Sequence, residues 1–273
     1  MIWLAALLAL PLPVPAGGAP QVPVVVRQRM TPVHVGVWYR GLPSGVPREA
    51  DLEGIRTLGF TAVTWPLQHV SGAEQLQRMA ARLGLAVIIR PESVPLTFEH
   101  AVRGDTRVDL WVNRTPRAEW PSLVWRAIAY GARTVSFDAG LSEGTGLWDV
   151  DGTPEWVPVA AALARQVTSN AGLVGSLGRA LPVAIDPPVD DLNLSLLENV
   201  RSWVIVVTNR NTAEGGTIDT YATFPEGVPA AEWLSLFDGA MMSMLYRPAG
   251  SRWHVRLGPG EAKVFVIDKR DQR

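Results

Sequence analysis

Three carboxylates in this sequence lie where an α/β protein would place reactive groups. Glu92 follows the apolar run Leu85–Ile89, Asp138 ends the run Thr134–Phe137, and Glu143 lies in the loop after it. Functional side chains of parallel α/β proteins gather at the carboxyl ends of the strands. Two carboxyl groups there could act as proton donor and as nucleophile or base, which is the chemistry of glycoside hydrolysis. If a pair acts here, we expect Glu92 with Asp138, the roles unassigned.

A purely structural interpretation of the same acids stands beside this one. Glu92 could pair with Arg90 or Arg114, and Asp138 could cap the backbone of the following loop, in which Asp149 and Asp151 also occur. Buried or strand-end carboxylates are commonly neutralised in this way. The sequence leaves both interpretations open.

Aromatic residues cluster at the same predicted strand ends. Trp38, Trp65, Trp111 and Trp148 lie at or just beyond them, and Tyr39 and Arg40 lie beside the first. An indole can stack on the apolar face of a pyranose while its N–H meets a hydroxyl. Together with Arg90, these residues form the predicted substrate-binding set. The alternative is that the tryptophans are large core or lid residues.

Other chemistries lack their residues. The chain has no cysteine, and His34 and His69 have no partners at metal-ligand spacing, so we expect no metal. Neither a G-x-S-x-G elbow nor a phosphate-binding glycine loop occurs, so we expect no serine nucleophile of that type and no cofactor.

The elements that must position these groups can be read from the apolar periodicity. A strand at His34–Trp38, a helix at about Arg48–Leu58, and a strand at Thr61–Trp65 make one βαβ unit. A helix at Gly72–Leu83 and the uniformly apolar Leu85–Ile89 repeat it. Successive units with right-handed crossovers predict a parallel sheet with helices outside it.

The pattern continues as far as residue 180. It predicts a short helix at 97–102, a strand at 107–112, a helix at 119–130, a strand at 134–137 and a long helix from 155 to about 177. From residue 181 onward, seven or eight short runs are separated by turn signals such as Gly258-Pro259-Gly260 and carry no helices between them. Such a pattern is typical of a β-sandwich.

Composition and the N-terminus bound the partners. The 273 residues carry a net charge of -1 and are 47% apolar. With no basic surplus, nucleic acid is not an expected partner. The apolar run Ile2–Leu12 is too short to span a bilayer, and the small residues 16–19 follow it. This predicts a signal peptide at 1–19, a linker at 20–32 and export to the periplasm or the cell exterior. A lipid-surface anchor or a buried N-terminal segment are the alternatives.

Three stretches in this order resemble the barrel glycoside hydrolases of the large retaining clan, most of all glycoside hydrolase family 42, the β-galactosidase type. They are GVWYRG followed by DLEGIRTLGFTAVTW, then LGLAVIIRPE, then WRAIAYGARTVSFDAG with GLWDVDGTPEW and its helix; the terminal LGPGEAKVFVI resembles the last hairpin of an appended β domain. The resemblance implies a (β/α) barrel that acts on an oligo- or polysaccharide.

The departures from that family concern its reactive residues. The family carries an acid/base Glu after its fourth strand and a nucleophile Glu after its seventh, whereas this chain offers Val112-Asn113-Arg114 at the latter place. Neither Glu can be carried over. Residues 33–180 are also far fewer than the ~250 of a full barrel. We therefore expect a contracted barrel of about five strands at 33–180 and a β-sandwich at 181–273.

A five-stranded barrel would leave open sheet edges, which proteins usually cover or pair. We expect them to be closed by the N-terminal segment, by the sandwich or by a second copy of the chain. Two functions remain open: an exported glycoside-hydrolase-like protein that hydrolyses or binds carbohydrate, and a non-catalytic carbohydrate-binding or protein-interaction remnant of such an enzyme.

Overall fold

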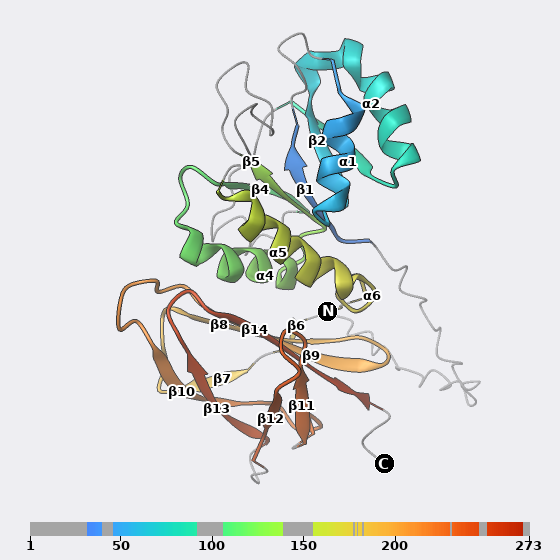
Figure 1. The fold of residues 1–273 in the computed structure, drawn as a ribbon. Helices are drawn as coiled ribbons and strands as arrows, with labels where there is room; N and C mark the ends of the chain where they lie inside the picture. The colour runs from blue at the N-terminus through green and yellow to red at the C-terminus, as the bar shows by residue number, and fades with distance from the viewer. Residues whose placement is uncertain are drawn as a thin grey trace, which may run out of the picture.

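The computed structural model describes residues 32–39, 46–91, 106–138, 155–176, 178, 180, 181, 183–229, 231–245 and 250–269. The predicted signal peptide, nearly all of the linker and the short helix at 97–102 lie outside these residues. The described chain has mixed α/β structure, with one parallel sheet followed by two antiparallel sheets (Figure 1).

The parallel sheet has five strands in the order β3-β2-β1-β5-β4. Their bounds are β1 His34–Trp38, β2 Ala62–Pro66, β3 Ala86–Arg90, β4 Arg107–Trp111 and β5 Thr134–Asp138, each within one residue of its prediction. The steps from β1 to β2, from β2 to β3 and from β4 to β5 all run in one direction along the sheet. Right-handed crossovers therefore place the intervening helices on one face.

That face is apolar and lies under helices. Alternation along the strands turns Val35, Val37, Val63, Leu110 and Phe137 toward it, and all five are buried. The helices are α1 Glu49–Thr57, α2 Val70–Arg82, α4 Trp120–Ala129 and α5 Val157–Ser169. At the junction of α1 and α5, Arg165 donates from Nη1 to the carbonyl of Leu58 at 3.0 Å.

The opposite face, here called the inner face, is concave. Thr64 of β2 and Ser136 of β5 flank β1, yet their hydroxyl oxygens lie 2.7 Å apart. Alternate strands of a flat sheet are roughly 10 Å apart. The hydroxyls meet because the sheet curls and because Gly36, between them on β1, has no side chain. A Cβ at Gly36 would lie 2.6 Å from the carbonyl oxygen of Ala62.

The curl brings together the two edges of the sheet. Arg90 on edge strand β3 forms an ion pair with Asp109 on edge strand β4, with Nη1 and Oδ2 3.0 Å apart. No backbone pairing between β3 and β4 occurs among the described residues. The described residues thus form a curled five-stranded parallel sheet, and the contracted barrel stays a prediction because no backbone bonds between β3 and β4 close the sheet.

One helix differs from its prediction. The expected single helix from 155 to 177 is divided into α5, Val157–Ser169, and the short α6, Ala171–Val174. Asn170, at the boundary, donates its side-chain amide to the carbonyl of Gln166 at 2.9 Å. Asparagine competes for backbone hydrogen bonds in this way, and so it favours helix ends over helix interiors.

The second half of the chain contains a six-stranded and a three-stranded antiparallel sheet, in the orders β12-β11-β14-β9-β8-β6 and β13-β10-β7. The strands are β6 Ala180–Leu181, β7 Ala184–Asp186, β8 Leu192–Glu198, β9 Ser202–Asn209, β10 Ile218–Thr223, β11 Glu232–Ser235, β12 Met241–Ser243, β13 Arg252–Leu257 and β14 Ala262–Asp268. The sequence predicts seven or eight short strands in this region, and the described residues form nine. The two sheets pack face to face around one apolar cluster that includes Ile205, Trp233, Trp253 and Phe265.

The six-stranded sheet is covered on both faces. Ile205 and Val207 of β9 face the three-stranded sheet, whereas Val204 and Val206 belong to the core that also contains helix α4. Figure 1 shows α4 and α5 between the parallel sheet and the antiparallel sheets. This double burial explains why β9 reads as an uninterrupted apolar run.

Candidate functional site

A tryptophan, a carboxylate and a second tryptophan form one row across the inner face. In the register of the sheet, Trp38 of β1 lies beside Asp138 of β5, and Asp138 lies opposite Trp111 of β4. All three end their strands at the carboxyl edge of the sheet. The exposed fractions are 5% for Trp38 and 4% for Asp138, whereas Trp111 is partly exposed.

A second carboxylate lies one layer below this row. Asp109 is fully buried and accepts hydrogen bonds from Nε1 of Trp38 at 2.8 Å and from Nη1 of Arg90 at 3.0 Å. Arg90 is itself only 8% exposed. Arg90 neutralises the Asp109 carboxylate, and the hydrogen bond from Trp38 to Asp109 fixes the position of the indole. A buried carboxylate of this kind is stable only while its charged partner remains.

Trp111 carries a cation on its ring. The guanidinium carbon of Arg114 lies 4.4 Å from the ring centroid. Stacking of this kind is worth ~0.5–1 kcal/mol at exposed sites. The sequence suggested Arg90 or Arg114 as a partner of Glu92. In the structure, Arg114 stacks on Trp111 and Arg90 forms an ion pair with Asp109.

Trp65 and Tyr39 lie at the carboxyl edge of the sheet, as predicted, but they do not reach the inner face and so do not come together with Trp38. Strand alternation turns Trp65 to the helical side, where it is fully buried and its ring centroid lies 5.7 Å from that of Tyr39. The Tyr39 hydroxyl donates to Oδ2 of Asp51 at 2.7 Å, and Arg48 binds the same carboxylate. Burial raises the pKa of Tyr39. Both aromatics are core residues: Tyr39 lies at the start of α1, and the indole of Trp65 donates to the carbonyl of His69 before α2.

Four predicted site residues lie outside the described chain: Arg40, Glu92, Glu143 and Trp148. Their roles stay predictions. Of the predicted set, the structure therefore brings together Trp38, Arg90, Trp111 and Asp138 on one face.

Asp109 is the residue that the sequence interpretation missed. Its signal was present in RVDLW, where Arg107 and Asp109 alternate with Val108 and Leu110. This alternation marks a strand with one polar face, in contrast to the uniformly apolar run of β3. A charged residue in mid-strand, on a sheet covered by helices, indicates a polar inner face.

The row has the residue types of a saccharide site. Indoles bind the apolar faces of sugar rings and a carboxylate binds or protonates their oxygens. Within the described ranges, no group of three or more histidines and carboxylates comes together as metal ligands. No described helix is long and apolar enough to cross a bilayer.

Comparison with known proteins gives structural likeness only. No family model and no curated protein matches the chain. An α-amylase from Geobacillus thermoleovorans, solved with acarbose, is similar at a TM-score of 0.48 and 10% identity, over 84% of this chain and 93% of that one. A GH30 endoxylanase from Clostridium papyrosolvens C71 is similar at 0.42 and 8%, over 87% and 97%. At such scores, these likenesses establish neither a family nor a function for this chain.

Proposed function

We propose that this protein acts on a carbohydrate at the carboxyl edge of its parallel sheet, as a glycoside-hydrolase-like protein of the family 42 type. The observation that supports the proposal is the row Trp38-Asp138-Trp111 on the inner face. Asp138 acts on the glycosidic oxygen or its water, the partly exposed indole of Trp111 holds the sugar ring, and the second carboxylate comes from Glu92 or Glu143. Asp109 is excluded from that role because Arg90 neutralises it.

The test is a screen of aryl-glycosides with wild type and Asp138→Asn. Because general acid or base catalysis contributes roughly 10²–10⁴-fold, the variant should lose at least about 100-fold in kcat on a substrate that the wild type turns over. Glu74→Gln, on the exposed face of α2, serves as the control and should retain full activity. Equal activity of wild type and Asp138→Asn would contradict the assignment.

Two tryptophans with similar surroundings provide a test of sugar binding and its control. Trp111 and Trp203 are each partly exposed and each carries a cation 4.4 Å from its ring centroid, Arg114 in one case and Lys269 in the other. Only Trp111 belongs to the row. Trp111→Ala should weaken saccharide binding by about tenfold in calorimetry, since an aromatic contact is worth ~0.5–1.5 kcal/mol. Trp203→Ala should leave it unchanged.

A non-catalytic carbohydrate-binding protein is the second candidate. It is favoured by the Arg90–Asp109 pair, which takes one of the two inner-face carboxylates of the described chain out of acid–base chemistry. This function predicts saccharide binding that depends on Trp111 without turnover of any aryl-glycoside. Turnover abolished by Asp138→Asn would decide for the enzyme.

We also propose that the chain is exported, on the apolar run Ile2–Leu12 and the small residues after it. N-terminal sequencing of protein secreted by an expression host tests this, with cleavage expected near residue 19. A second copy covering the open sheet edges stays a prediction, and sedimentation velocity is its test.

A further inference from the structure

We propose that the gap between β12 and β13 accepts an extended segment of a partner protein, in which acidic and apolar residues alternate. The two strands are edge strands of different sheets. They meet at Leu245 and Arg252, which exchange backbone hydrogen bonds of 2.8 and 2.7 Å, and then separate. The hollow between them has a volume of about 410 Å³.

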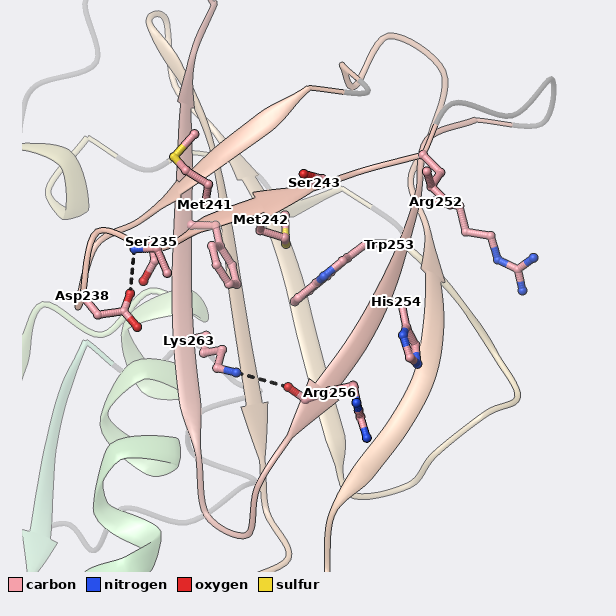
Figure 2. A pocket seen from close by; sticks show the side chains of 13 residues that line it. Ser235, Asp238, Met241, Met242, Ser243, Arg252, Trp253, His254, Arg256 and Lys263 are labelled. Carbon is pink, nitrogen blue, oxygen red and sulfur yellow. Dashed lines mark hydrogen bonds between the residues drawn. The ribbon is translucent and has the colours of Figure 1, made fainter.

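The backbone groups on both sides of the gap are aimed at it. Extending the Leu245–Arg252 register would pair Ser243 with His254 and Met241 with Arg256. No such bonds form between these described residues. The pairing of β13 with β10 and of β12 with β11 uses the alternate residues, so Ser243 and His254 direct N–H and C=O toward the gap. Lys263 Nζ donates to the carbonyl of Arg256 at 3.2 Å and closes one end (Figure 2).

The width of the gap suits one strand. Packed sheets are about 10 Å apart, and hydrogen-bonded strands are ~4.8 Å apart, so two edges of a sandwich can each bond a strand placed between them. Extended peptides bind sheet edges in this manner, through main-chain bonds and alternate side-chain contacts.

The floor of the hollow is apolar. Figure 2 shows the Trp253 indole projecting from β13 toward Met242 of β12, with Phe265 of β14 also lining the hollow. Met241 also lines the hollow and is 54% exposed, so it adds apolar surface at the flank. Trp253 is 7% exposed and offers no open ring face for a sugar, which favours a peptide. Residues of an inserted strand that face inward should therefore be apolar.

The outward side chains of β13 determine which residues suit the outward-facing positions of the bound segment. Arg252, His254 and Arg256 lie on the side of β13 away from Met242 (Figure 2). The Asp219 carboxylate contacts the side chains of both His254 and Arg256. Arg252 stacks on the Tyr221 ring at 4.1 Å and has no carboxylate partner in the described chain. A strand paired with β13 places its outward residues beside the guanidinium groups of Arg252 and Arg256, so acidic residues fit there.

The experiment is fluorescence anisotropy with a labelled peptide of about eight residues, alternating Glu and Val, against one alternating Lys and Val. We expect the acidic peptide to bind at least about tenfold more tightly than the basic one. His254→Pro should weaken this binding at least about tenfold, because it removes the N–H that faces the gap and spares the bonds to β10. His254→Asn, which keeps that N–H, should bind within about threefold of wild type.

A second pair guards against misfolding of the proline variant. If thermal unfolding shows that His254→Pro has lost its fold, Ser243→Pro against Ser243→Ala makes the same comparison on β12. The proposal is overturned if the acidic peptide does not bind or if the proline variants bind it as wild type does. It is also overturned if maltohexaose takes the place of the peptide, or if the free edges prove to join two copies of this chain in sedimentation.

Discussion

Gly36 is the residue on which the curl of the parallel sheet depends. It lies between the touching hydroxyls of Thr64 and Ser136, and a Cβ there would meet backbone at 2.6 Å. Gly36→Ala should therefore lower the free energy of unfolding by ~1–3 kcal/mol, the usual cost of overpacking. Urea unfolding followed by circular dichroism measures it.

Gly258→Ala is the control for this prediction. A Cβ at Gly258 would lie 3.7 Å from a Glu261 oxygen, an ordinary contact, and its backbone is not in the left-handed region. Its stability should stay within about 0.5 kcal/mol of wild type. Equal losses in the two variants would mean that the close approach at Gly36 is not what matters.

His34 makes stability depend on pH. It begins β1 on the inner face, its Nδ1 is buried without a hydrogen-bond partner in the described chain, and burial lowers its pKa below 6.5. A lowered histidine pKa gives stability that is fully present above pH 6.5 and is lost as the pH falls through the folded-state pKa. His34→Gln should thus lose less of its urea midpoint than wild type between about pH 7.5 and pH 5. Parallel losses in both proteins would refute this.

At the scale of elements, the ion pair between Arg90 and Asp109 joins the two edges of the parallel sheet. Without it, β3 and β4 would be held to the sheet on one side only among the described strands. Backbone pairing does not bring Arg90 and Asp109 together, because β3 pairs with β2 and β4 pairs with β5. The open sheet edges expected of a five-stranded barrel are thus joined in part by side chains rather than by backbone bonds.

A double-mutant cycle tests this contact. Asp109→Leu and Arg90→Met should each cost ~3–5 kcal/mol, because each leaves the charge of the other residue buried without its partner. Replacing both partners, as Arg90→Met with Asp109→Leu, should recover most of that loss, because an apolar pair needs no neutralisation. Urea unfolding of all four proteins gives the coupling. Additive losses would show that the two side chains act independently.

At the scale of the whole molecule, helix α4 joins the parallel sheet to the antiparallel ones. Its residues share one core with Val204, Val206 and Val264, and the ring centroid of Trp125 lies 5.3 Å from that of Phe237. Gly260, in the turn before β14, has a φ of 66°, and a Cβ there would meet the carbonyl of Ala118. The two halves therefore form a continuous apolar interior.

Because of this shared core, the chain should unfold in a single transition. Residues 32–178 produced alone should expose the α4 face and bind an apolar dye such as ANS, as loosely packed states do. Calorimetry of the full chain and dye fluorescence of the fragment are the measurements. Two separate transitions, or a fragment that melts cooperatively and binds no dye, would show that the halves are independent.

The sequence by itself determined the elements. Apolar periodicity and glycine stops predicted the five parallel strands and the series of short antiparallel strands after residue 180, because local patterns of burial and turn chemistry specify them. It also placed Trp38, Arg90, Trp111 and Asp138 at strand ends. It missed the helix break at Asn170, since an asparagine is tolerated in many helices.

Only the tertiary structure decided which side chains share a face. Trp38 and Trp65 both end strands, yet a difference of one residue in register turns one to the inner face and the other beneath the helices. The partnership of Arg90 with Asp109 likewise depends on the curl of the whole sheet, which no local pattern encodes. Strand position is a property of short segments, whereas the composition of a site depends on how distant segments bend toward one another.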